Sequence, residues 1–90
     1  MYFALFYDTA PDYLERRKPL REAHLSLLRK LHAEGKLVMA GAFDPPDGAL
    51  LVFRVDSSAE VEAFVKADPY LQNGLVTGWR IRPWTVVVGQ

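Results

Sequence analysis

Pro19–Gly35, with the sequence PLREAHLSLLRKLHAEG, predicts the main helix of the fold. At about 100° per residue, one face of this helix carries an apolar stripe made of Leu20, Ala23, Leu27, Leu28 and Leu31. Pro19 fits the first helical turn, and Gly35 is typical of the position that follows a helix. His24 lies near the middle of the stripe. An ionisable ring that faces the core needs a hydrogen-bond partner or a chemical role, so His24 is the first candidate functional residue.

The residues before this helix predict a strand and a helical lead-in. Tyr2–Tyr7 is a continuous apolar run of strand length, which is typical of a central strand buried on both faces. Asp8 and the following Thr-Ala-Pro-Asp end this strand. Tyr13–Lys18 is expected to form a short helical segment ahead of the main helix.

The residues after the main helix predict a hairpin. Lys36–Phe43 and Ala49–Asp56 are two apolar segments of strand length. They are separated by Asp44–Gly48, which contains two prolines and a glycine. This composition marks a tight reversal of the chain.

A second helix and a last strand complete the pattern. Ser57 and Glu60 have the spacing of a capping box, which predicts a helix start. The helix should end near Asp68, because a residue before proline is pushed out of the helical region. Leu75–Val88 is the predicted last strand, in which Pro83 indicates a bulge, a bend or an edge position.

The predicted order β-α-β-β-α-β matches the ferredoxin-like α+β fold, with a four-stranded antiparallel sheet and both helices on one face. Right-handed crossovers make the two helices antiparallel. Residues 1–90 form a single domain. The free face of the sheet would carry many apolar side chains, which a monomer rarely exposes to water. We therefore expect a homodimer that packs sheet face to sheet face.

Composition excludes several classes of function. Eleven basic residues balance eleven acidic ones, so no charge excess favours nucleic acid or a membrane surface. The absence of cysteine excludes disulfides, thiolate catalysis and cysteine-ligated metals. No signal peptide and no apolar run of membrane-spanning length are visible. We expect a soluble cytoplasmic protein.

Chain order gathers polar residues at one edge of the sheet. The start of the first helix, the end of the second and the hairpin loop meet there, bringing Tyr7, Asp8, Arg21, His24, Asp44, Asp47, Asp68 and Tyr70 to that edge. Asp68 continues the buried stripe of the second helix and is as unusual there as His24 is on the first. A buried carboxylate beside an imidazole fixes the tautomer of the ring, as in many acid/base histidines.

Structural interpretations stand beside these functional ones. His24 alone can be a satisfied core histidine, and Asp68 alone can cap the short turn that begins at Pro69. Asp44 and Asp47 fit ordinary turn chemistry. His24 and Asp68 can also form a buried pair that only fixes helix packing.

A basic cluster made of Arg16, Arg17, Lys18 and Arg21 lies near the start of the main helix. It is either a solvated face balanced by acidic neighbours or an anion site, where a substrate carboxylate or phenolate meets Arg21. His32 lies at the polar margin of the helix, and two histidines without a clustered third ligand make a weak metal site. No phosphate loop or nucleophile elbow appears, so neither a metal nor a cofactor is expected.

Several motifs resemble the YCII-related (YciI-like) family of the dimeric α+β barrel superfamily. They are the aromatic first strand that ends in Tyr7-Asp8, R-x-x-H at Arg21 and His24, H-x-x-x-L-x-x-L-x-x-E-G ending at Gly35, Ala40-Gly41, Ala67-Asp68-Pro69-Tyr70 and Pro83-Trp84. The resemblance implies a ferredoxin-like fold, a homodimer joined through its sheets, and a site built on His24 and Asp68. One branch of the family resembles a dehydrochlorinase of a chlorinated hydroxyquinol, a lyase step that needs no cofactor. The short Asp44–Gly48 loop departs from many relatives, so one wall of the pocket is expected to be shorter and the substrate of those relatives transfers less well.

These observations predict a small cofactor-independent lyase or isomerase acting on an anionic or phenolic metabolite. His24 is the expected general acid/base and Asp68 its orienting partner. Arg21 is the expected substrate anchor, and Tyr7, Tyr70 and Asp44 complete the substrate-binding set. The alternative is a non-catalytic dimeric module that binds a small molecule or supports a partner enzyme.

Overall fold

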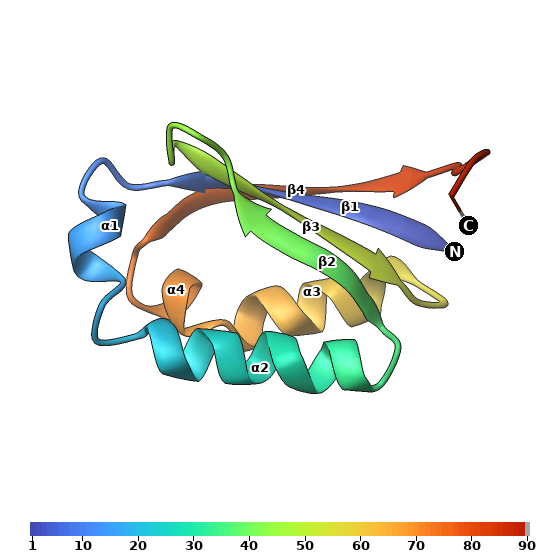
Figure 1. Cartoon of the computed structure of the whole chain (residues 1–90), viewed down its shortest axis with the longest axis horizontal. Coiled ribbons are helices and arrows are strands. Elements are labelled where there is room, and N and C mark those ends of the chain that lie inside the picture. Colours follow the sequence, from blue (N-terminus) through green and yellow to red (C-terminus); the bar gives the residue numbers. More distant parts are fainter. Residues whose placement is uncertain (90) are drawn as a thin grey trace.

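The sheet has four antiparallel strands in the order β2-β3-β1-β4 (Figure 1). The computed structural model describes residues 1–89. The strands are β1 (Tyr2–Thr9), β2 (Leu37–Ala42), β3 (Gly48–Arg54) and β4 (Val76–Trp84). Strand β1 pairs with β3 on one side and β4 on the other, so the predicted central position of the first strand is confirmed.

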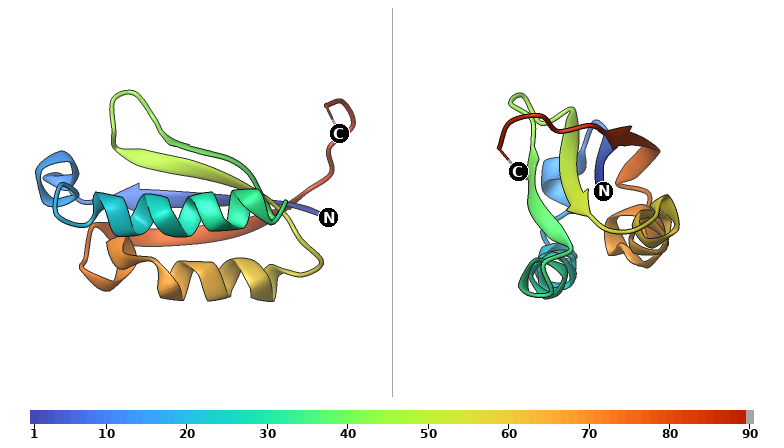
Figure 2. Two further views of the ribbon diagram at one scale, coloured as in Figure 1. Left: turned by 60° about the horizontal axis from the view of Figure 1, so that its bottom comes forward. Right: turned by 90° about the vertical axis from the view of Figure 1, so that its right-hand side faces the viewer.

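Four helices lie on one face of this sheet (Figures 1 and 2). They are α1 (Tyr13–Arg16), α2 (Arg21–Ala33), α3 (Ser58–Ala67) and α4 (Pro69–Gln72). Helices α2 and α3 run antiparallel beneath the sheet, as expected, while α1 and α4 are single turns at one end (Figure 2). The ferredoxin-like α+β fold is therefore confirmed. None of the helices in the described residues is long and apolar enough to cross a membrane.

The two long helices pack differently against the sheet. Val61, Phe64 and Val65 of α3 are buried in the main core, with the Phe53 and Phe64 rings 5.3 Å apart. Helix α2 has no fully buried residue, and its leucines are only partly buried against the core. Complete burial of a large apolar side chain contributes about 1.5–3 kcal/mol, so α3 is the better anchored helix. The looser packing of α2 leaves space between it and the sheet.

Several element boundaries differ from the sequence prediction. Pro19 precedes α2 instead of occupying its first turn, since the helix begins at Arg21 after Leu20. Ala23 is exposed, so it does not belong to the buried stripe. Gly35 has a φ of 77° directly after the helix, which confirms its predicted role.

The sheet edges explain two further differences. Strand β4 ends at Trp84, not Val88, because Trp84 already pairs with Tyr2 at the start of β1. Pro83 lies in this edge strand, which confirms one of the three predicted alternatives. The irregularity in the pairing of β1 with β4 lies between Asp8 and Thr9 and not at Pro83. Strand β1 ends at Thr9, two residues beyond its predicted end at Tyr7.

Helix α3 begins as predicted, but its cap differs from a full capping box. Ser57 is the N-cap residue, and its side chain makes no capping hydrogen bond. The Glu60 carboxylate accepts a hydrogen bond at 3.1 Å from the backbone N–H of Asp56 instead of that of Ser57. The helix ends at Ala67, as expected from Pro69.

Candidate acid–base site

Asp68 lies at the junction of α3 and α4 and is fully buried. Its backbone is extended (φ −73°, ψ 120°), as expected for a residue before proline. Its Oδ1 accepts a hydrogen bond at 3.0 Å from the backbone N–H of Tyr70 and so caps α4. The cap role and the site role predicted for Asp68 are thus compatible.

Two side chains from distant parts of the chain donate to the same carboxylate. The hydroxyl of Tyr7 on β1 donates to Oδ2 at 2.8 Å. Nδ1 of His24 on α2 lies 2.7 Å from Oδ1. Because an ionised carboxylate only accepts hydrogen bonds, this contact assigns the proton to Nδ1. A buried charge needs such compensation, and three donors supply it here.

The His24 ring is held by a second contact and leaves one nitrogen available. The ring stacks on Tyr70 with a centroid separation of 3.7 Å and an interplanar angle of 8°. Its Nε2 has no hydrogen-bond partner among residues 1–89, and no buried side-chain nitrogen or oxygen in that range lacks a partner. Nε2 is therefore accessible, with its lone pair available to accept a proton.

The two tyrosines beside the pair keep their protons at neutral pH. Burial raises the pKa of Tyr7 well above its usual range, and the adjacent negative charge and hydrogen bond of Asp68 raise it further. Burial also raises the pKa of Tyr70, followed by the effect of Tyr13, although Arg21 partly opposes this rise. Both phenols are therefore neutral hydrogen-bonding groups.

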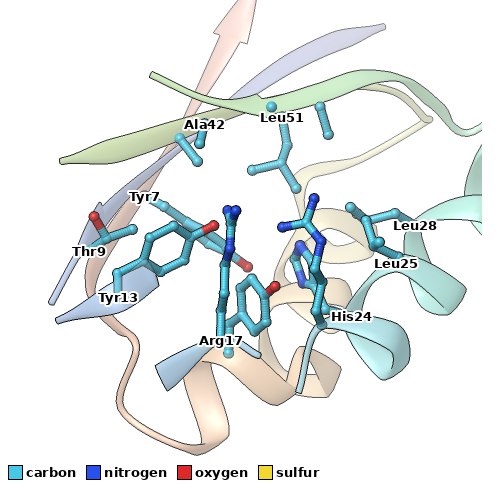
Figure 3. Close-up of a pocket in the computed structure, with 14 residues that line it drawn as sticks. Tyr7, Thr9, Tyr13, Arg17, His24, Leu25, Leu28, Ala42 and Leu51 are labelled. Atoms are coloured by element: carbon cyan, nitrogen blue, oxygen red, sulfur yellow. The ribbon is translucent and has the colours of Figure 1, made fainter. Parts of the chain in front are cut away.

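A cavity of about 150 Å³ lies beside His24, between α2 and the sheet (Figure 3). Its polar residues come from β1, from α1 and the residue directly after it, from α2 and from α4, and are Tyr7, Thr9, Tyr13, Arg17, Arg21, His24 and Tyr70. Its apolar residues come from α2, β2 and β3 and are Leu25, Leu28, Ala40, Gly41, Ala42, Ala49 and Leu51. The small residues of β2 leave room opposite the helix, so the cavity combines an apolar wall with a polar one.

One tight backbone contact fixes the wall that carries Tyr7. A Cβ atom at Gly48 would lie 2.7 Å from the backbone oxygen of Tyr7. Only glycine therefore allows β3 to begin this close to β1.

The structure brings together most of the residues predicted from the sequence. His24, Arg21, Tyr7 and Tyr70 all line the cavity, and Asp68 lies directly behind His24. Asp44 does not line it, because this residue lies in the exposed turn between β2 and β3. Turn chemistry therefore accounts for Asp44.

Three polar lining residues were not predicted as site residues. Thr9 was expected only to follow the first strand, Tyr13 was expected only to begin a helical lead-in, and Arg17 was part of a basic cluster from which only Arg21 was selected. The ring of Tyr13 meets that of Tyr70 edge to face at 5.8 Å. The run Ala40-Gly41-Ala42 was the available signal for a cavity wall, since small side chains in a strand leave space.

No group of three or more histidine, cysteine or acidic residues suited to a metal ion occurs in residues 1–89. The chemistry that these described residues can supply is proton transfer at His24 Nε2. Hydrogen bonding from the phenols and charge pairing with the guanidinium groups accompany it.

The fold and this arrangement define a small ferredoxin-like α+β protein with a histidine–aspartate pair at a cavity. The chain belongs to the YCII-related domain family, whose model matches residues 1–85. It is 31% identical to "Protein YciI" of Escherichia coli O6:H1 and 28% identical to an uncharacterized protein of Haemophilus influenzae. Each match covers 97% of this chain and 99% of the relative. The resemblance found in the sequence is therefore confirmed.

Solved structures extend the comparison. The chain is similar to 5-chloro-2-hydroxyhydroquinone dehydrochlorinase (TftG) from Burkholderia phenoliruptrix AC1100, solved as a complex with 2,5-dihydroxybenzoquinone. The TM-score is 0.81 at 28% identity, with 94% of each chain covered. Rv0793 from Mycobacterium tuberculosis shares the fold, with a TM-score of 0.54, 14% identity and coverage of 98% and 97%.

Proposed function

We propose that this protein is a cofactor-independent lyase or isomerase in which His24 transfers a proton to or from a small anionic or phenolic ring compound. The single observation that carries the proposal is the His24 ring itself. Its Nδ1 is fixed by buried Asp68 at 2.7 Å, while Nε2 is free beside a cavity. A histidine held in one tautomer with its second nitrogen available is the arrangement that general acid/base catalysis requires.

The cavity suits a single ring. An apolar cavity of about 150 Å³ in another protein binds benzene, which is the size found here. Leu25, Leu28 and Leu51 supply apolar contacts for the faces of such a ring, and Arg21 supplies a cation for an acidic oxygen. Tyr7 and Tyr70 complete the wall beside His24.

The dehydrochlorinase relative suggests the reaction type. In such an elimination, Nε2 of His24 accepts the proton of one ring hydroxyl and passes it to the chlorine-bearing ring carbon, to which the electron pair has moved. Nε2 then accepts the proton of a second hydroxyl, whose electron pair moves through the ring, and chloride leaves with the carbon–chlorine bonding pair. Loss of one proton and one chloride converts a chlorinated hydroxyquinol into a hydroxyquinone without any external oxidant. His24 then releases its proton to water.

The proposal is tested by measuring chloride release from 5-chloro-2-hydroxyhydroquinone by the purified protein, with binding of the related quinone 2,5-dihydroxybenzoquinone followed by calorimetry. We expect release above the uncatalysed rate and binding of 2,5-dihydroxybenzoquinone. Binding without chloride release would support the second candidate function, a non-catalytic module that holds a small ring compound in the same cavity. Absence of both would contradict a ring-binding site.

The proposal includes a homodimer formed through the free face of the sheet. Strand pairing places Ala4 with Val52 and Phe6 with Leu50 on the face opposite the helices, and Met39 beside Val52. Met39 is 65% exposed, so this apolar face extends to the sheet edge. Sedimentation at micromolar concentration should show a dimer, and Leu50→Glu should convert it to a monomer. A monomeric wild-type protein would contradict this assembly.

A further inference from the structure

The cations from Arg16 to Arg29 fall into two groups. Those that point outward have acidic partners: Lys18 lies 3.1 Å from Glu15, and Arg29 lies 3.1 Å from Glu22. Arg16 likewise pairs with Asp12 at 3.5 Å and donates to the backbone oxygen of Asn73 at 2.7 Å. Their charges are balanced on the surface.

Arg17 and Arg21 form the second group. Both line the cavity, and neither makes an ion pair with an acidic residue among residues 1–89. The Arg17 guanidinium lies 5.3 Å from the centre of the Tyr13 ring, a contact that orients the cation and leaves its charge unneutralised. Figure 3 shows this side chain extending toward the sheet between Tyr13 and His24.

Asp68 is the one buried acid among residues 1–89, and it does not neutralise these cations. Asp68 is fully buried, and its carboxylate already accepts from Tyr7, His24 and the backbone of Tyr70. The cavity therefore contains two guanidinium charges that have no acidic partner among residues 1–89. Each guanidinium offers a planar set of donors that matches an acidic oxygen group.

We propose that Arg17 is a second anion-binding residue of this cavity, so that its ligand is a flat single-ring compound with two acidic groups. This inference rests on the proposed function, since it assigns a second charge to the ring that His24 would act upon. Arg21 binds one acidic group beside His24, and Arg17 binds the other from the end of α1. Arg17 thereby distinguishes doubly from singly ionised ligands of the same shape.

The test compares two probes that share one ring. 2,5-Dihydroxybenzoquinone has two vinylogous acid hydroxyls, whereas its monomethyl ether retains only one. Their dissociation constants are measured by calorimetry for the wild type, Arg17→Gln and Lys18→Gln. Lys18→Gln is the matched control, because it removes the same charge from the adjacent residue, whose partner is exposed Glu15.

We expect Arg17→Gln to weaken binding of the doubly acidic probe by about 10- to 100-fold, the effect of losing a charge-assisted contact. Binding of the monomethyl ether should change less than about threefold, and Lys18→Gln should alter neither. Equal effects of Arg17→Gln on both probes, or no effect on either, would overturn the inference while leaving the proposed function intact. Failure of the wild-type protein to bind either probe would instead contradict the proposed function.

Discussion

Replacing His24 by alanine should lower the rate of the proposed elimination by about 10²- to 10⁴-fold, the usual contribution of a positioned general acid or base. The protein should remain folded, because Asp68 keeps its hydrogen bonds from Tyr7 and the backbone of Tyr70. Water can also enter from the cavity to occupy the vacated position. The expected loss of unfolding free energy is therefore only about 1–2 kcal/mol. Initial rates of chloride release and thermal melts measure the two effects separately.

The chain provides its own control for this substitution. His32 is the only other histidine, and its Nδ1 contacts the backbone oxygen of Leu37 at 2.9 Å, away from the cavity residues. His32→Ala should leave turnover within about twofold of the wild type, because it removes no group from the site. Unchanged turnover in His24→Ala would exclude His24 as the proton-transfer group.

Replacing Asp68 by alanine should lower the free energy of unfolding by about 3–5 kcal/mol. The substitution leaves the Tyr7 hydroxyl and the Tyr70 backbone N–H without their acceptor in a fully buried position. It also frees the His24 ring. For a domain of this size the melting temperature should fall by at least about 12 °C. Chemical denaturation measures the energy directly.

A second substitution separates stability from function at the same position. Asp68→Asn keeps the volume and one acceptor oxygen, so Tyr70 retains its N-cap. The negative charge opposite His24 is lost, and we expect less than about half the destabilisation of the alanine variant. Turnover should still fall by at least about tenfold, because the neutral amide no longer stabilises the imidazolium that forms when His24 accepts a proton. An asparagine variant with wild-type turnover would assign the pair a purely structural role.

The order of helices and strands was predictable because glycine and proline residues lie at the ends of these elements. Gly35 ends α2, Pro69 ends α3, and the Asp44–Gly48 turn separates β2 from β3. Glycine permits the positive φ that ends a helix, and proline restricts the residue before it, so neither effect depends on distant contacts. The end of β4 was not predictable in this way, because it depends on where the first strand begins to pair.

The pairing of His24 with Asp68 was predictable for a different reason. Both residues interrupt an apolar stripe, and the fold places the two interruptions at the same end of the sheet. Arg17 and Tyr13 could not be separated from their neighbours in the same way. They lie in or directly after the four-residue helix α1, too short for a periodic pattern, and only tertiary packing directs them into the cavity.

The cavity was the feature of the site that the sequence predicted least well. It exists because Ala40, Gly41 and Ala42 of β2 are small and because α2 is less deeply packed than α3. Small residues in a strand can leave a cavity, but they can equally allow a helix to pack closely against the strand. The distance between α2 and β2 decides which of the two occurs, and the sequence does not specify that distance.

The central claim is that Asp68 holds the proton of His24 on Nδ1 and leaves Nε2 free to meet a ligand. The most direct measurement is ¹⁵N NMR of the neutral histidine rings, recorded with and without saturating 2,5-dihydroxybenzoquinone. The spectrum is simple because the chain has two histidines, and His32→Ala assigns them. The account predicts a protonated Nδ1 and an unprotonated Nε2 for His24, with the Nε2 signal shifting when the probe binds. A proton on Nε2, or an Nε2 signal unmoved by the bound probe, would contradict it.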